Sequence, residues 1–239
     1  MCTVTLVPHP ETENGFVLTS NRDEAVLRKT FPPEVFSEGG TRLLYPKDQE
    51  AGGSWIGMSE RKRTICLLNG GFKKHLRKPP YRKSRGLVVR ELLAAPTFHD
   101  TARNYDYEGI EAFTAVVVEY SSQLQFLELV WDGTAKNMKE LPLKSHIWSS
   151  SLLYSLEEIA LRKERFDSYK MHHPLTPETL LKFHSSGGEK GEEGLVIDRD
   201  ASRRTALNAG RASACRLSRQ GRAEATHCVR HAQRSTSRH

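Results

Sequence analysis

Two short stretches near the start of the chain carry side chains that can do chemistry together. The first is Cys2, and removal of the initiator methionine is expected to leave this cysteine at the N-terminus. The α-amine of an N-terminal residue has a pKa of about 7.7–8.0, so it can serve as general base for its own thiol. The alternative is a small apolar residue that only opens an edge strand.

The second stretch is a charged turn, Asn21-Arg22-Asp23-Glu24, at the end of the second predicted strand. Residues 2–7 and 15–20 are predicted to pair as antiparallel strands, which would let the Asp23 carboxylate reach and orient the α-ammonium of residue 2. Arg22 is a candidate for binding a substrate carboxylate. Asn and Asp at strand ends also form purely structural turns, so that interpretation stays open.

Asn69 is the candidate oxyanion donor. It ends another predicted strand and is followed by Gly70-Gly71, where the backbone can approach a ligand closely. Its side-chain amide can donate to a developing oxyanion, and losing one such donor typically costs ~10²–10³ in rate.

A basic segment follows this asparagine directly. Residues 72–86 contain seven Lys and Arg, among them the candidate ligand-binding residues Lys73, Lys74, Arg77 and Arg85. One interpretation is a solvated loop, and the other is a collar for an anionic ligand such as an acyl-CoA phosphate, a haem propionate or a lipid head group. Specific nucleic-acid binding is not predicted, because Tyr81 is the only aromatic residue inside the basic run.

The elements that must position these residues are read from apolar patterning. Strands are predicted at residues 2–7, 15–20, 54–59, 64–69, 113–120, 124–131 and 145–149, with the start of one more at 195–198. Helices are predicted at 84–95, 152–169 and from 176 onward. Residues 25–53 are expected to be irregular, since Pro and Gly pairs interrupt them. Runs of strands and helices without regular βαβ alternation predict an α+β fold of mostly antiparallel sheets covered by helices.

Composition divides the 239-residue chain into two parts. Residues 1–198 carry a formal charge of −1, whereas 199–239 carry +8, with ten Arg, no Lys and no aromatic residue. We therefore predict a domain over 1–198, lacking its closing strands, and a disordered tail over 199–239. The tail is interpreted either as a basic nucleic-acid-binding arm or, preferably, as out-of-frame sequence.

Four cysteines without disulfide or metal spacing indicate a reducing compartment, and a cytoplasmic location is expected. Neither a signal peptide nor a transmembrane segment is predicted. No metal site is predicted, although Cys228 and His231 have a metal-like spacing, and no cofactor is predicted. The oligomeric state cannot be inferred from these features.

The spaced motifs together resemble the NRDE family, whose eukaryotic members are called transport and Golgi organisation protein 2. The resemblance covers residues 1–198 and rests on these stretches: Met1-Cys2, Asn21-Arg22-Asp23-Glu24, Gly52-Gly53-Ser54-Trp55-Ile56-Gly57, Leu68-Asn69 and Ser84-Arg85-Gly86-Leu87. It implies an N-terminal-nucleophile-hydrolase-like αββα sandwich of antiparallel sheets. By wider analogy, the Cys-type amidases that cleave bile salts and penicillin carry a similar Asn-x-Asp, which matches Asn21 and Asp23 and implies a substrate-binding role for Asn21.

The chain departs from those amidases at two places. Ser20 stands where they carry an arginine, and Ser149-Ser150-Ser151 stands where they use a later asparagine. The first functional expectation is a Cys2-dependent amide or thioester hydrolase acting on a small anionic or acyl substrate. The alternative is a non-catalytic carrier or trafficking factor for haem, acyl-CoA or lipid. A basic interaction protein acting through the tail is a third, weaker class.

Overall fold

The structure is a computed structural model. It describes residues 3–9, 14–22, 28–186 and 195 with their side chains, and it describes the backbone of 24–25, 205–206, 213–217 and 223–227.

Fourteen strands and four helices are present in the described residues. The strands are β1 (Thr3–Pro8), β2 (Phe16–Ser20), β3 (Glu24–Ala25), β4 (Thr30–Glu38), β5 (Thr41–Asp48), β6 (Ile56–Ser59), β7 (Arg63–Asn69), β8 (Phe113–Glu119), β9 (Gln125–Trp131), β10 (Lys136–Leu141), β11 (His146–Ser149), β12 (Thr205–Ala206), β13 (Ser213–Leu217) and β14 (Ala223–His227). The helices are α1 (Arg85–Ala94), α2 (Phe98–Asn104), α3 (Leu156–His172) and α4 (Pro177–Ser185).

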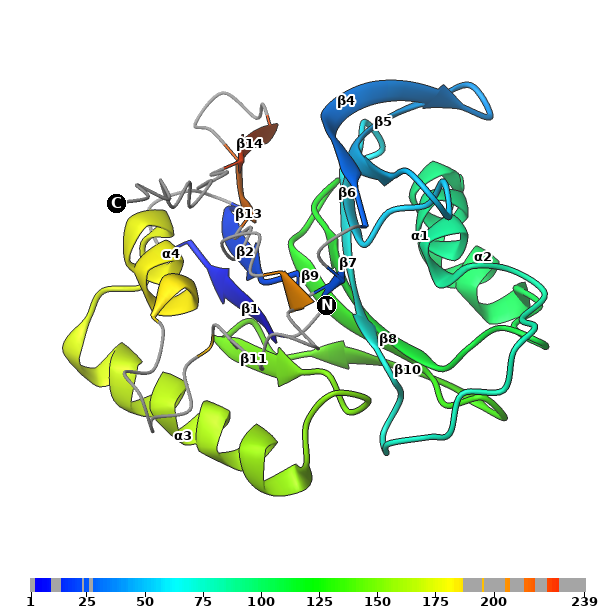
Figure 1. Ribbon diagram of the computed structural model, residues 1–239. Helices are drawn as coiled ribbons and strands as arrows, with labels where there is room; N and C mark the ends of the chain where they lie inside the picture. Colours follow the sequence, from blue (N-terminus) through cyan, green and yellow to red (C-terminus); the bar gives the residue numbers. More distant parts are fainter. Residues whose placement is uncertain are drawn as a thin grey trace, which may run out of the picture.

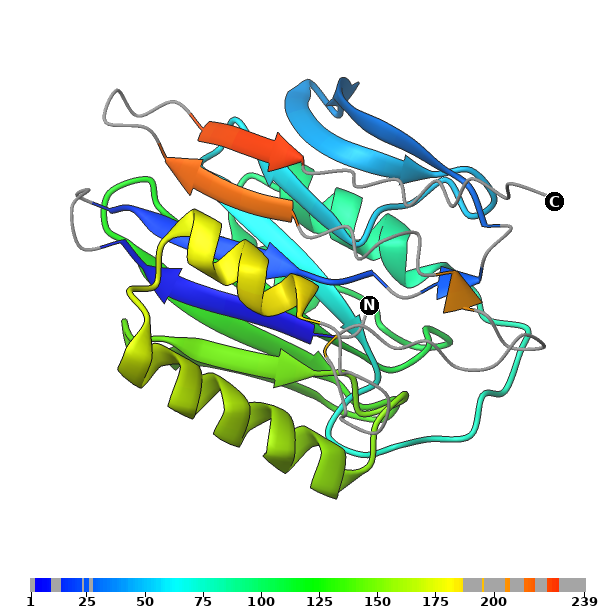
Figure 2. The same cartoon turned by 60° about the vertical axis from the view of Figure 1, so that its left-hand side comes forward.

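Two antiparallel sheets form the centre of the molecule. One has the order β11-β1-β2-β13-β14 and the other the order β10-β9-β8-β7-β6-β5-β4. Helices α1 and α2 lie on the outer face of the larger sheet, and α3 and α4 lie on the opposite side of the molecule against the smaller one (Figure 1). The turned view shows the strands of the two sheets stacked between these helices (Figure 2). The predicted αββα sandwich is thus confirmed.

Three apolar clusters correspond to the three interfaces between the layers. Between α1, α2 and the larger sheet lie residues such as Val88, Leu92 and Val117. Between the two sheets lie Leu6, Leu18, Cys66, Val116 and others. Between the smaller sheet and helices α3 and α4 lie Val7, Val17, Phe166, Leu180 and Phe183. Alternate residues of β1 and β2 thus serve different cores, as period-2 strands buried on both faces require.

The region expected to be irregular forms a long hairpin instead. Strands β4 and β5 occupy residues 30–48, and Gly39 and Gly40, with φ of +55° and +77°, make the turn between them. Pro32 and Pro33 are tolerated because β4 is an edge strand and its register shifts between Thr30 and Pro33. Proline was therefore the wrong reason to exclude a strand here.

Other departures lie at the ends of elements and in the tail. Helix α2 and strand β10 were not predicted, and α3 begins at Leu156 after a capping box on Ser155 rather than at residue 152. The predicted strand at 195–198 lies outside the described residues except for Leu195. In the tail, the described backbone of β13 pairs with β2 and β14 pairs with β13, so the smaller sheet continues past β2 where closing strands were expected to be missing. The division into 1–198 and 199–239 stays a prediction.

Helix α1 is fixed at both ends by contacts that need particular residues. At its start, a Cβ on Gly53 would lie 2.5 Å from the Gly86 carbonyl carbon, and the Ser54 N–H donates to Gly86 O at 3.1 Å. At its end, the buried Arg63 donates to Leu92 O at 2.7 Å and Ala95 O at 2.8 Å. Arg63 thus satisfies carbonyls that the helix itself leaves unpaired.

Helix α4 is joined to the smaller sheet by a buried polar network. The Asn21 Nδ2 donates to the backbone oxygens of His184, at 3.0 Å, and Leu195, at 3.2 Å, so its Oδ1 faces His184 Nδ1 at 2.6 Å. Because Oδ1 only accepts, Nδ1 carries the proton and Nε2 accepts from the Thr5 hydroxyl at 2.8 Å. Burial, and then the nearby Arg162 charge, lower the pKa of His184 to about 3. The histidine is neutral at physiological pH.

The close approach at the start of α1 generates the first prediction. Gly53→Ala should lower the free energy of unfolding by about 2 kcal/mol or more, because the added methyl meets backbone that cannot rotate away. Gly40→Ala is the control, since its Cβ meets nothing within 4 Å and carries only the cost of a positive φ, about 1–2 kcal/mol. Urea unfolding measures both variants. Equal or smaller loss at Gly53 would show that this packing is not required.

The neutral His184 generates a prediction on pH. Its pKa in the folded protein lies below the unfolded value, so the unfolded state binds the extra proton between about pH 6.5 and 3. Stability from this group is therefore complete above pH 6.5 and falls by up to about 1.4 kcal/mol per pH unit below it. His184→Gln should remove this slope, whereas His172→Gln, which replaces an exposed histidine, should keep it. Chemical unfolding from pH 7 to 4.5 tests this, and an unchanged slope in His184→Gln would contradict it.

Candidate functional site

The start of β1 and the end of β2 lie side by side, at one end of the strands of the smaller sheet. The Asn21 N–H donates to Thr3 O at 3.0 Å, and Thr3 pairs with Ser149 at the end of β11. Cys2, which is bonded to Thr3, and Asp23 lie outside the described residues, so their predicted roles stay predictions. Asn21 is fully buried, and its side chain holds α4 as described above.

A buried cation lies next to the start of β1. Arg162 of α3 is 5% exposed and donates from Nη1 to the Thr3 hydroxyl at 3.0 Å. Its guanidinium carbon lies 3.9 Å from the centre of the Tyr154 ring. Helix α3 therefore holds the side chain of Thr3, the first residue that the structure describes.

Arg22 connects the charged turn to the larger sheet. Its Nη2 donates to Asp48 Oδ2 at 2.8 Å, and its guanidinium carbon lies 4.3 Å from the centre of the Trp55 ring. Asp48 also accepts from Arg28 Nε at 2.8 Å. Burial raises the pKa of Asp48, but the Ala51 N–H and the two arginines outweigh it and hold the pKa below its usual value.

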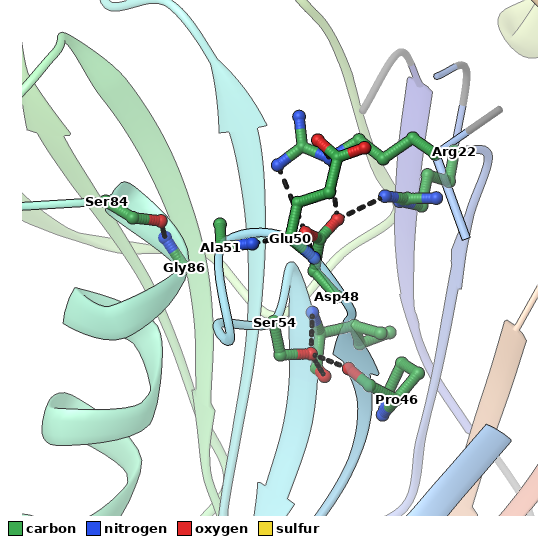
Figure 3. Close-up of polar contacts among 10 residues, drawn as sticks. Arg22, Pro46, Asp48, Glu50, Ala51, Ser54, Ser84 and Gly86 are labelled. Carbon is green, nitrogen blue, oxygen red and sulfur yellow. Dashed lines mark hydrogen bonds and ion pairs between the residues drawn. The ribbon is translucent and has the colours of Figure 1, made fainter. Parts of the chain in front are cut away.

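Asp48 in turn shapes the loop that carries the glycine motif. Its Oδ1 accepts from the N–H groups of Glu50 and Ala51, at the turn that leads to Ser54 (Figure 3). The Ser54 hydroxyl lies 2.7 Å from Pro46 O, and the Ser84 hydroxyl caps α1 by accepting from Gly86 N–H. A series of contacts that begins at Arg22 therefore links the motifs at 21–24, 52–57 and 84–87.

The Asn69-Gly70-Gly71 segment is clamped by the two serines that follow β11. Ser150 Oγ donates to Asn69 O at 2.7 Å, and Ser151 Oγ donates to Gly71 O at 2.6 Å. A Cβ on Gly70, whose φ is +92°, would lie 2.4 Å from Ser151 Oγ. The Asn69 side-chain amide has no hydrogen-bond partner among the residues that the structure describes.

A buried carboxylate pairs with some of the cationic side chains of the basic segment and leaves others exposed. Glu111, 5% exposed, faces Arg77 at 3.2 Å, Arg85 at 3.2 Å and His75 at 3.4 Å. Arg85 also donates to Ala112 O, which accepts from Gly70 N–H as well. Lys73 and Lys74 are exposed. Of the predicted collar, Arg85 therefore lies beside the Asn69 segment, while the two lysines face solvent.

Asn69 is connected to the start of β1: Ser150 donates to Asn69 O, and the preceding Ser149 pairs with Thr3. Arg85 lies beside the same segment. Sequence reasoning missed Arg162, His184 and Glu111. A signal existed for the first two: Arg162 lies three residues after Ile159, and His184 lies four residues after Leu180, on the buried faces of their helices. Nothing in the sequence pointed to Glu111.

Cys66, the second cysteine of the sequence, lies in the core as predicted. Cys66 is fully buried in β7, and burial raises the pKa of its thiol to about 12. The described residues contain no group of three or more His, Cys, Asp or Glu that could hold a metal ion. None of the helices in the described part of the chain has the length and apolar character needed to cross a membrane.

Comparison with solved structures places the fold. The Caenorhabditis elegans orthologue of N-acylethanolamine-hydrolysing acid amidase matches with a TM-score of 0.56 at 11% identity, over 77% of this chain and 86% of the amidase. Penicillin V acylase from Agrobacterium tumefaciens matches at a TM-score of 0.45 and 12% identity, over 72% of this chain and 59% of that one. A variant of conjugated bile acid hydrolase from Clostridium perfringens matches at 0.43 and 9%, over 69% and 57%. The fold is that of the N-terminal-nucleophile hydrolases.

Comparison with protein-family models and with curated protein sequences shows to which family the chain belongs. No curated protein matches the chain significantly. The family model described as Transport and Golgi organisation 2 matches residues 1–186, which contain every spaced motif and exclude the tail. The chain belongs to the Transport and Golgi organisation 2 (NRDE) family.

Proposed function

We propose that the chain is an amide or thioester hydrolase in which Cys2 is the nucleophile and a small anionic or acyl compound is the substrate. One observation carries the proposal: Asn69 is half-buried with no amide partner among the described residues, and its carbonyl accepts from Ser150, the neighbour of the residue that pairs with Thr3 at the start of β1. The fold is shared with an amidase that hydrolyses N-acylethanolamines, which supports the reaction class.

The proposed reaction uses two half-reactions. The Cys2 thiol gives its proton to the free α-amine, and its sulfur attacks the acyl carbon. Asn69 donates to the oxyanion of the tetrahedral intermediate, which collapses as the leaving amine or thiol takes the proton. Water then attacks the acyl-cysteine, releasing the acid and restoring the thiol. Asp23 orients the α-amine in this scheme.

The chain offers supports for this machinery beyond the predicted residues. Arg162 fixes Thr3, the neighbour of Cys2, and Ser150 fixes the Asn69 backbone. Asn21, placed by resemblance among the substrate-binding residues, is buried with its amide donating to two backbone carbonyls, so we assign it a positioning role. Arg22, paired with Asp48, has the same role in our proposal.

A carrier of haem, acyl-CoA or lipid using the same site is the second candidate. The observation that favours it is the exposed pair Lys73 and Lys74, which has no acidic partner in the described residues and can receive an anionic group. A carrier should keep its ligand affinity in Cys2→Ala, unless the thiolate ligates haem iron. It should lose affinity in Lys73→Glu with Lys74→Glu.

Labelling of Cys2 and Cys66, measured at each cysteine by peptide mass, tests the nucleophile. Intact mass should show loss of Met1 without acetylation, because a blocked amine cannot act as base. A thiol-directed acylating probe should modify Cys2 at least about tenfold faster than Cys66, whose raised pKa leaves little thiolate at neutral pH. Cys66→Ala should keep the rate of labelling at Cys2, and Cys2→Ala should abolish labelling at residue 2 and turnover. Retained Met1 in folded protein would remove the catalytic interpretation.

Substitution of Asn69 tests the oxyanion donor. Asn69→Ala should lower kcat by ~10²–10³ with a small change in KM, because the donor acts on charge that develops in the transition state. Asn137→Ala, which replaces an exposed asparagine in the same sheet, should leave kcat unchanged. Turnover of amide and thioester substrates gives the comparison, with circular dichroism to confirm folding. Wild-type kcat in Asn69→Ala would assign the oxyanion to another donor.

A further inference from the structure

The segment between β7 and α1 separates its basic residues into two classes. Four of the seven pair with carboxylates: Arg77 and Arg85 with Glu111, Arg82 with Asp106, and Lys83 with Glu91. These pairs attach the segment to the body of the protein at several points along its length. In addition, Arg82 donates to Glu108 O and Asp106 O at 2.8 Å and 2.7 Å.

The second class faces outward. Lys73, Lys74 and Lys78 are exposed and have no acidic partner among the described residues. Two large apolar side chains lie between and beside them: Phe72 is 52% exposed and Leu76 is 81% exposed. The stretch 72–78 therefore presents apolar and cationic side chains together to solvent. Its backbone runs along the outside of the molecule between β7 and α1 (Figure 1).

This combination has a specific physical complement. Phe and Leu gain from leaving water, and lysines with long stems keep their charges at the level of lipid phosphates while their methylenes lie lower. An anionic leaflet attracts each basic residue near its surface, which increases partitioning by roughly fivefold per lysine. A stable protein interface buries roughly 800 Å² on each side, which two projecting apolar side chains do not supply.

We propose that residues 72–78 form a loop that docks the protein on an anionic lipid bilayer, with Phe72 and Leu76 inserted below the head groups. The Arg77, Arg85 and His75 contacts to Glu111 hold the loop in shape before it meets the membrane, so little conformational entropy is lost on binding. The proposal does not depend on hydrolase activity. It places the Asn69-Gly70-Gly71 segment, which continues directly into Phe72, beside the lipid surface.

Vesicle flotation of the full chain tests the loop. With phosphatidylcholine vesicles containing about 30% phosphatidylserine we expect binding that weakens with salt, and with pure phosphatidylcholine much less. Replacing Lys73, Lys74 and Lys78 with Glu should reduce partitioning by at least about 100-fold. Phe72→Ser with Leu76→Ser should reduce it by at least about tenfold, since the loss of two apolar side chains removes the insertion.

The matched control is another exposed Leu-Lys pair. Leu143→Ser with Lys144→Glu changes the same side-chain types in the turn before β11, which lies toward the far end of β1 from Thr3. This variant should bind vesicles as the wild type does. If it weakens binding as much as the loop variants, net charge and not the loop controls binding, and the proposal is wrong.

A second readout separates the loop from the basic tail, which all variants share. Phe72→Trp should show quenching by brominated acyl chains in the anionic vesicles, beyond any seen in the wild type. Full vesicle binding by the triple lysine variant, or binding without quenching at residue 72, would overturn the proposal. So would binding to polyglutamate without binding to vesicles, which would indicate an acidic protein as partner.

Discussion

The architecture depends on a requirement at the ends of β1 and β2: polar groups buried there must find hydrogen-bond partners inside the protein. Asn21 meets this requirement with both its backbone and its side chain. Its backbone N–H satisfies Thr3 O, and its side chain joins the backbone of His184 and Leu195 to the His184 ring. Losing one partner would leave the others buried and unpaired, at a cost of about 1–3 kcal/mol each. The position of β1 relative to α4 is fixed in this way.

The same logic changes how the family motifs are understood. Arg22 pairs with Asp48, Asp48 shapes the turn before Ser54, and Gly53 packs backbone to backbone against Gly86. A charged turn, a glycine motif and a helix start, separated by about thirty residues each, thus share one packing arrangement. In this chain the spacing of the motifs corresponds to a packing contact, so not every motif residue needs a chemical role.

The residues proposed to take part in chemistry lie at the strand ends that this packing brings together. Ser150 and Ser151 hold the backbone of Asn69 and Gly71. Glu111 holds Arg85 and Arg77 beside it. The basic stretch is consequently part anchor and part exposed surface: one part pairs with Glu111 beside the end of β7, and the other is the part that we propose docks on an anionic bilayer.

The sequence by itself determined the family, the antiparallel α+β class of the fold and seven of the fourteen strands, because apolar period and spaced motifs can be read along the chain. It also placed Asn69 and Arg85 in one predicted site; in the structure Arg85 and the Gly70 N–H share the Ala112 carbonyl, and the roles of Asn69 and Arg85 stay predictions. It failed at β4 and β5, where an edge position lets a strand carry prolines.

Only the tertiary structure decided which charges are neutralised and which are free. Arg77 and Lys73 look alike in the sequence, but one meets Glu111 from thirty-four residues away and the other meets solvent. Likewise, His184 and Arg162 became supports of the N-terminal strand because helices folded back over a sheet formed much earlier in the chain. Contacts between distant residues depend on how layers pack, and no local pattern encodes the partner of a buried charge.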